Sequence, residues 1–128
     1  LLAGAHIASD MTSEEDKAFI KNQLHYEFRT TNASKTGKIR IERQLEKGYY
    51  TFRTKPNDTI IHTENADGIY PAEGGIVVAR FPEANVAAAI GYDKIEEGGA
   101  KTLCWSIMLE SAYEFDALYK ASIEWLMK

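Results

Sequence analysis

The chain has 128 residues and a formal net charge of −4; 45% of its residues are hydrophobic and 27% are charged. This length fits a single domain over residues 1–128 that can bury a core, and the composition excludes a disordered chain. No apolar run approaches the roughly 18 residues of a membrane-spanning helix. The single cysteine, Cys104, excludes an internal disulfide, and its place within an apolar strand pattern predicts a small buried side chain.

The charge is unevenly distributed along this acidic chain. Residues 1–64 contain ten Lys/Arg and nine Asp/Glu, whereas residues 65–128 contain five and ten. Within residues 35–55 there are seven basic residues and two acidic ones. Such a layout influences solubility and the encounter with charged partners rather than the fold.

The first ten residues permit three interpretations. Ala3-Gly4-Ala5 has the small-x-small form of a signal-peptidase site, so the protein is periplasmic or exported if residues 1–5 are a signal remnant. Leu1–Gly4 also resembles the residues before the lipid-bearing cysteine of bacterial lipoproteins, but position 5 is alanine. If Met11 is the native start, residues 1–10 are a tag remnant and the protein is cytoplasmic. In the third interpretation, Ala5–Ser9 is a short edge strand.

A helix is predicted from Thr12 to about Arg29. Thr12 and Glu15 have the spacing of a capping box, which satisfies backbone N–H groups at a helix start. Apolar side chains recur at every fourth position and would form the buried stripe: Ile20, Leu24 and Phe28.

Six strands are predicted next, because alternating or continuous apolar segments are separated by turn-forming residues. They are Lys38–Leu45, Tyr49–Thr54, Thr59–Thr63, Ile76–Phe81, Val86–Tyr92 and a strand around Trp105 that alternates from Leu103 to Leu109. The run Ile76–Phe81 is predominantly apolar, which is typical of a strand covered on both faces. The stretch from Glu64 to Gly75 is expected to be irregular.

The last segment, Lys101–Lys128, is predicted to supply the thickest part of the core. After the Trp105 strand, the apolar period changes from two to that of a helix at Ala112. The helical stripe contains Phe115, Leu118, Tyr119, Ser122, Trp125 and Leu126. Both tryptophans of the chain lie in this segment.

The predicted fold is α+β, with a curved antiparallel sheet of about six strands, an N-terminal helix and a long C-terminal helix packed on the sheet. If Ala5–Ser9 adds a strand, the order of elements resembles the helix-grip fold of START and Bet v 1 proteins. That resemblance implies a cavity for an apolar small molecule between the sheet and the final helix. Its lining would be Trp105, Phe115, Tyr119 and Trp125.

The basic first hairpin is the candidate binding surface. Its outward positions are Lys38, Arg40, Tyr49, Arg53 and Lys55. Aromatic and basic residues interleaved in this way can bind a polyanion, although a charged face also keeps a sheet soluble. Because the chain is acidic overall, nucleic acid is disfavoured, and an acidic protein partner or a self-complementary homo-oligomer contact is expected.

The sequence contains few candidates for a metal site or a catalytic nucleophile. His62, Glu64 and Asp67 are a close group of potential metal ligands, but their spacing matches no recognised metal site. Cys104 lies within a strand, where a nucleophilic thiolate is not favoured. With no catalytic residue, metal or cofactor assigned, we expect a non-catalytic domain that binds a protein partner or ligand through its sheet face or basic hairpin. The alternatives are a cavity protein that binds or transforms an apolar small molecule, and an enzyme that uses His62 and nearby carboxylates.

Overall fold

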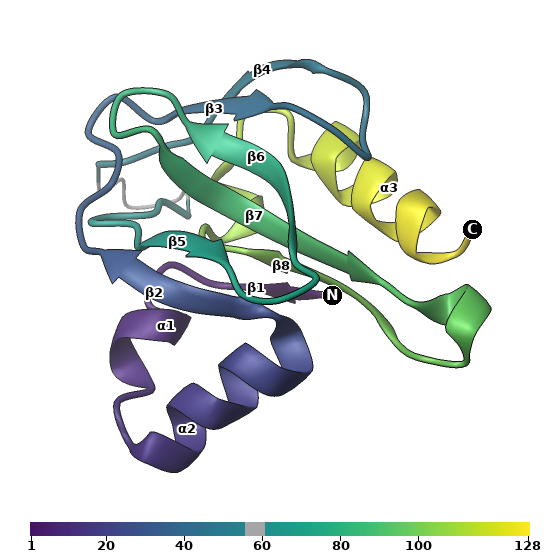
Figure 1. The fold of residues 1–128 in the computed structure, drawn as a ribbon. Coiled ribbons are helices and arrows are strands. Elements are labelled where there is room, and N and C mark those ends of the chain that lie inside the picture. The colour runs from purple at the N-terminus through teal and green to yellow at the C-terminus, as the bar shows by residue number, and fades with distance from the viewer. Residues whose placement is uncertain (56–60) are drawn as a thin grey trace.

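The computed structural model describes residues 1–55 and 61–128, and it confirms an α+β fold with a curled sheet (Figure 1). The strands are β1 (Leu2–Ala3), β2 (Tyr26–Thr30), β3 (Lys38–Ile41), β4 (Gly48–Thr51), β5 (Gly68–Pro71), β6 (Ile76–Phe81), β7 (Val86–Asp93) and β8 (Lys101–Trp105). The helices are α1 (Ile7–Asp10), α2 (Glu14–Phe19) and α3 (Phe115–Leu126). A π-helical turn, η1 (Ile20–Leu24), follows α2, and the turns η2 (Ile95–Glu97) and η3 (Leu109–Ser111) are 3-10 helices.

The sheet is organised around β7. Its main path runs β1-β8-β7-β6-β3-β4, and β5 pairs with β7 while carrying β2 on its other edge. All pairs between the strands that the structure describes are antiparallel except β1 with β8, so the sheet is mixed. Two register shifts between β6 and β7 increase the local twist and help the sheet to curl.

The main core lies between the sheet and α3. Trp105 on β8 is only 2% exposed, and its indole Nε1 donates a hydrogen bond of 3.1 Å to Ser122 Oγ on α3. Ser122 Oγ in turn donates to the Leu118 carbonyl at 2.8 Å. Trp125, one turn further along α3, packs over Gly91 of β7, where a Cβ atom would lie 3.2 Å from the tryptophan ring. Lys101–Lys128 therefore supplies a large part of the core, as predicted.

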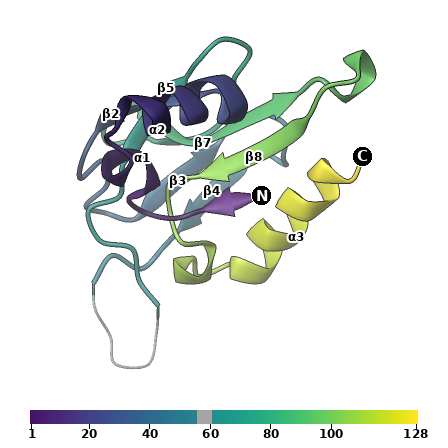
Figure 2. The ribbon, with the colours of Figure 1, turned by 90° about the horizontal axis from the view of Figure 1, so that it is seen from below.

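A second, smaller core covers the opposite face of the sheet. It lies beneath α1, α2 and η1, and Figure 2 shows these helices and α3 on opposite sides of the strands. Its buried residues are Ala8, Ile20, Tyr26, Ile69, Ala87, Ile90 and Cys104. Burial raises the pKa of the Cys104 thiol to about 11, although the chain's amino terminus lowers it slightly, so the side chain is a neutral thiol at pH 7.

The predicted helix Thr12–Arg29 is helical from Glu14 to Leu24, but its last five residues are not helical. Ser13, rather than Thr12, caps α2, because its Oγ accepts the Asp16 N–H at 3.1 Å. The helical segment ends at His25, whose left-handed backbone (φ 63°) reverses the chain into β2. Pairing with β5 then outweighs the helical spacing. A strand at this position forms hydrogen bonds with the backbone groups on the outer edge of β5, whereas a continued helix would leave those groups of β5 without a backbone partner.

Other boundaries also differ from prediction. The stretch 64–75, expected to be irregular, contains β5; the hairpin strands end at Ile41 and Thr51; and the Trp105 strand ends at Trp105. The predicted strand Thr59–Thr63 lies partly outside the described residues, and residues 61–63 are not a strand. In place of a strand at Ala5–Ser9, the chain forms β1 and then α1, so the condition for the helix-grip order is not met.

A carboxylate organises the loop before β3. Glu83 Oε1 accepts hydrogen bonds from Ser34 Oγ (2.6 Å), the Lys35 N–H (2.9 Å), and both the N–H (3.0 Å) and the hydroxyl (2.8 Å) of Thr36. Partial burial raises the pKa of Glu83, but these hydrogen bonds outweigh it and lower the pKa to about 2.

We predict that Glu83→Gln lowers the free energy of unfolding by about 1 kcal/mol at pH 7, because the loop loses charge-assisted hydrogen bonds at an exposed site. Since the folded-state pKa is depressed, the wild-type advantage should be complete above the ordinary glutamate pKa of 4.5 and should vanish as the pH falls towards 2. Urea unfolding of the wild type and of Glu83→Gln across this pH range measures the difference in their free energies of unfolding. A difference that does not change with pH would contradict the assignment.

We predict that Ser122→Ala costs about 1–3 kcal/mol of stability, because it leaves the buried Trp105 N–H without an acceptor. In a Trp105→Phe background the same substitution should cost much less, since no indole donor is left. Urea denaturation of the four proteins in this double-mutant cycle gives the coupling energy. Equal costs in both backgrounds would show that the hydrogen bond contributes nothing.

Candidate functional site

The outer face of the β3–β4 hairpin brings three of the predicted binding residues together. Ile39 and Ile41 point into the core, so Lys38 and Arg40 point outward. Across the ladder, Arg40 lies opposite Tyr49, and Lys38 lies opposite Thr51. Tyr49 is 69% exposed, which is unusual for a large aromatic side chain on a strand.

A charged network anchors this face to β6. Glu42 accepts hydrogen bonds from Arg40 Nη2 at 2.7 Å and from Arg80 Nε at 3.1 Å. Hydrogen bonds to Glu42 and to the Tyr49 hydroxyl raise the pKa of Arg40. Burial raises the pKa of Glu42, but the two arginines outweigh it, so the pKa falls below its ordinary value. Arg40 and Glu42 are therefore both charged at neutral pH.

Sequence reasoning missed Arg80, because it belongs to an apolar run and reaches Glu42 only through the pairing of β3 with β6. A lone arginine inside an otherwise apolar strand was the available signal.

A shallow pocket of about 520 Å³, here called the hairpin pocket, lies beside this network. It is lined by Arg40, Ile41, Glu42, Arg43, Lys47, Gly48 and Tyr49. The chain turns at Gln44, which has a left-handed backbone (φ 71°), and this turn places Arg43 and Lys47 on the pocket rim. Within the described part of the chain, neither Arg43 nor Lys47 forms an ion pair. The pocket therefore has three cations and a single carboxylate, which is already shared by two arginines.

The other two predicted hairpin residues lie outside this pocket. Arg53 turns towards η3: its Nη1 lies 3.4 Å from the Ser111 and Ala112 carbonyls, and its guanidinium stacks on Tyr113 at 4.2 Å from the ring centroid. Lys55 is exposed beyond the end of β4. Arg53 therefore helps to fasten the segment before α3.

The four aromatic residues expected to line a ligand cavity fill the core or contact one another. Trp105 and Trp125 are buried, and the rings of Phe115 and Tyr119 lie 5.6 Å apart. Lys101 Nζ lies 4.5 Å above the Trp125 ring, and Tyr119 is 47% exposed. None of the three pockets identified in the described residues is lined by these side chains.

The weak metal candidates are separated. His62 Nε2 lies 3.7 Å from Glu64 Oε1, whereas Asp67 is buried and faces the N-terminal segment. Asp67 Oδ2 accepts the Ser9 N–H at 2.9 Å, and Oδ1 lies 3.7 Å from His6 Nδ1. Across residues 1–55 and 61–128, no three His, Cys, Asp or Glu side chains are grouped to hold a metal ion.

No protein-family model, curated protein or solved structure matches this chain. Among the residues that the structure describes, no helix has the length and apolar character needed to cross a membrane. Charge, exposure and hydrogen bonding at the hairpin are thus the observations from which a function can be inferred.

We predict that Glu42→Gln lowers the free energy of unfolding by about 1 kcal/mol, because Arg40 and Arg80 are direct partners on adjacent strands and would then repel each other. The loss should be larger at low salt, since salt screens the repulsion. Glu46→Gln is the matched control, as it removes the same charge from an exposed position in the same turn. Equal losses in the two variants would refute a specific role for Glu42.

Proposed function

We propose that this protein is a non-catalytic binding domain that engages an acidic segment of a partner protein through the hairpin pocket. The observation that supports the proposal is the grouping of Arg40, Arg43 and Lys47 around the exposed ring of Tyr49. Guanidinium and ammonium groups donate hydrogen bonds to carboxylates, and arginine and tyrosine are enriched among residues that dominate binding energy.

The charge balance favours an acidic protein segment as the ligand. Glu42 neutralises only part of the cationic charge, and it holds Arg40 in a fixed orientation, so less side-chain entropy is lost on binding. A nucleic acid would need a longer basic track, and the acidic second half of the chain would repel it. The same acidic half could supply the partner segment from a second copy, which would make the interaction a homo-oligomer contact.

The proposal is tested with a fluorescent capped peptide of alternating glutamate and glycine. Arg43→Glu combined with Lys47→Glu should weaken its binding at least about tenfold, and wild-type affinity should fall as salt rises. The matched control is Lys120→Glu with Lys128→Glu, which changes the net charge equally at exposed positions near the C-terminus.

An equal loss in the control pair, or binding that salt leaves unchanged, would reject the hairpin pocket as the site. Sedimentation of the wild type and the hairpin double variant separates the two partner sources. A dimer that the double variant abolishes identifies a second copy of the chain, and a monomer in both leaves a different protein as the partner.

A further inference from the structure

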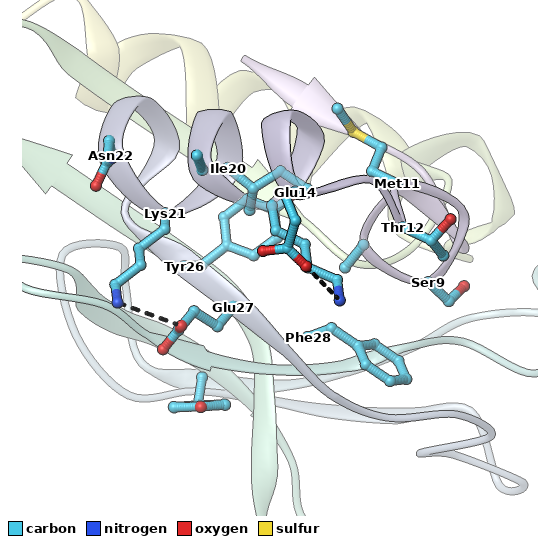
Figure 3. A pocket seen from close by; sticks show the side chains of 14 residues that line it. Ser9, Met11, Thr12, Glu14, Ile20, Lys21, Asn22, Tyr26, Glu27 and Phe28 are labelled. Atoms are coloured by element: carbon cyan, nitrogen blue, oxygen red, sulfur yellow. Dashed lines mark ion pairs between the residues drawn. The ribbon is translucent and has the colours of Figure 1, made fainter.

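A groove lies between α2 and β2, at the other end of the sheet from β4 (Figure 3). It encloses about 740 Å³, and its floor consists of Ala8, Ile20 and Tyr26 from the second core. Figure 3 shows Glu14 and Lys21 projecting from the helical side towards the strand, where Phe28 forms the opposite wall. We call it the α2–β2 groove; it combines an apolar floor with a rim of polar side chains.

The strand wall is an open sheet edge that begins at Phe28. The Ala72 N–H donates to the His25 carbonyl at 2.9 Å, and the register then places Glu27 opposite Tyr70 and Phe28 opposite Ile69. Hydrogen-bonded pairs alternate along an antiparallel ladder, so Glu27 bonds to β5 while the backbone groups of Phe28 point away from it.

The position of Pro71 supports this assignment. Pro71 lies opposite Tyr26 at a non-hydrogen-bonded pair of the ladder, where its missing N–H group costs no hydrogen bond. Tyr26 is buried, whereas Phe28 is 42% exposed. Among the described residues, no hydrogen bond outside the β2–β5 ladder involves the Phe28 backbone.

The charges on the rim cancel. Lys17 Nζ lies 4.0 Å from Glu14, and Lys21 Nζ lies 3.9 Å from Glu27 across the groove. Such exposed, long ion pairs contribute little and can open for a ligand. Two lysines and two glutamates therefore favour neither an acidic nor a basic occupant. Recognition is left to backbone hydrogen bonds at the edge and to apolar contact with the floor.

We infer that the α2–β2 groove binds an extended, uncharged segment of a partner protein. The segment adds to the sheet beside β2, exchanges backbone hydrogen bonds with Phe28, and places one large apolar side chain on Ile20 and Tyr26. An unpaired strand edge is complementary to another extended backbone, and the pocket beside it selects the side chain. This site is separate from the hairpin pocket and does not depend on its proposed role.

The test uses the complete chain, labelled for amide NMR, and a capped peptide of alternating leucine and threonine as the probe. Binding should shift the Phe28 amide and slow its hydrogen exchange, while the Glu27 amide, already paired with Tyr70, should change little. Phe28→Pro removes the edge N–H and should weaken binding about tenfold more than Phe28→Ala, which keeps it. Ala18→Trp, on the helical wall, should block the groove and leave the strand intact.

A second probe pair tests strand pairing on the unmodified protein, whether or not Phe28→Pro folds. Two peptides are N-methylated at alternate residues, one at the odd positions and the other at the even positions. Only one of the two should bind, because only one set of amides faces β2 and methylation of that set blocks the hydrogen bonds. Equal binding of the two N-methylated peptides would overturn the inference. So would an unchanged Phe28 amide chemical shift at about 1 mM peptide, or chemical-shift changes confined to the hairpin pocket. Arg43→Glu with Lys47→Glu should leave this binding unchanged, which separates it from the function proposed for the hairpin.

Discussion

The burial of β7 on both faces is the constraint on which the rest of the structure depends. Residues 87–91 of this strand are almost completely inaccessible, and they pair with β6 on one edge and with β8 and β5 on the other. All but Ile90 are alanine or glycine, so Trp125 can approach Gly91 on one face while Ala87 and Ile90 meet the N-terminal helices on the other. Larger residues would push the two layers apart.

This central strand leaves the two ends of the sheet to differ in chemistry. The β4 end carries Arg43, Lys47 and an exposed tyrosine beside Arg40, whose guanidinium is held in place by Glu42. The β2 end carries balanced charges, an apolar floor and an open backbone edge. Both proposed binding sites therefore lie on elements whose inner sides are fixed by the core, which limits the entropy that binding would cost.

Part of the candidate site could be predicted from local alternation. Lys38, Arg40 and Tyr49 alternate with core residues, so their outward direction followed from the strand period. Arg53 could not be placed, because the chain leaves β4 after Thr51 and its backbone bonds to Ser111, far away in sequence. The roles of Arg80 and of the α2–β2 groove depend on pairing between strands that are far apart in the sequence, and a local pattern does not show which strands pair.

The sequence by itself determined the α+β class, the strands Ile76–Phe81 and Val86–Asp93 to within a residue, and the tryptophan-rich core between the last strand and helix, because hydrophobic periodicity is a local property. Only the tertiary structure decided that residues 26–30 are a strand. Their spacing also suits a helix, and the choice rests on hydrogen bonds to β5, a segment that itself lacks a strong strand pattern. Long-range pairing overrode local preference there, and the same pairing created the open edge at Phe28.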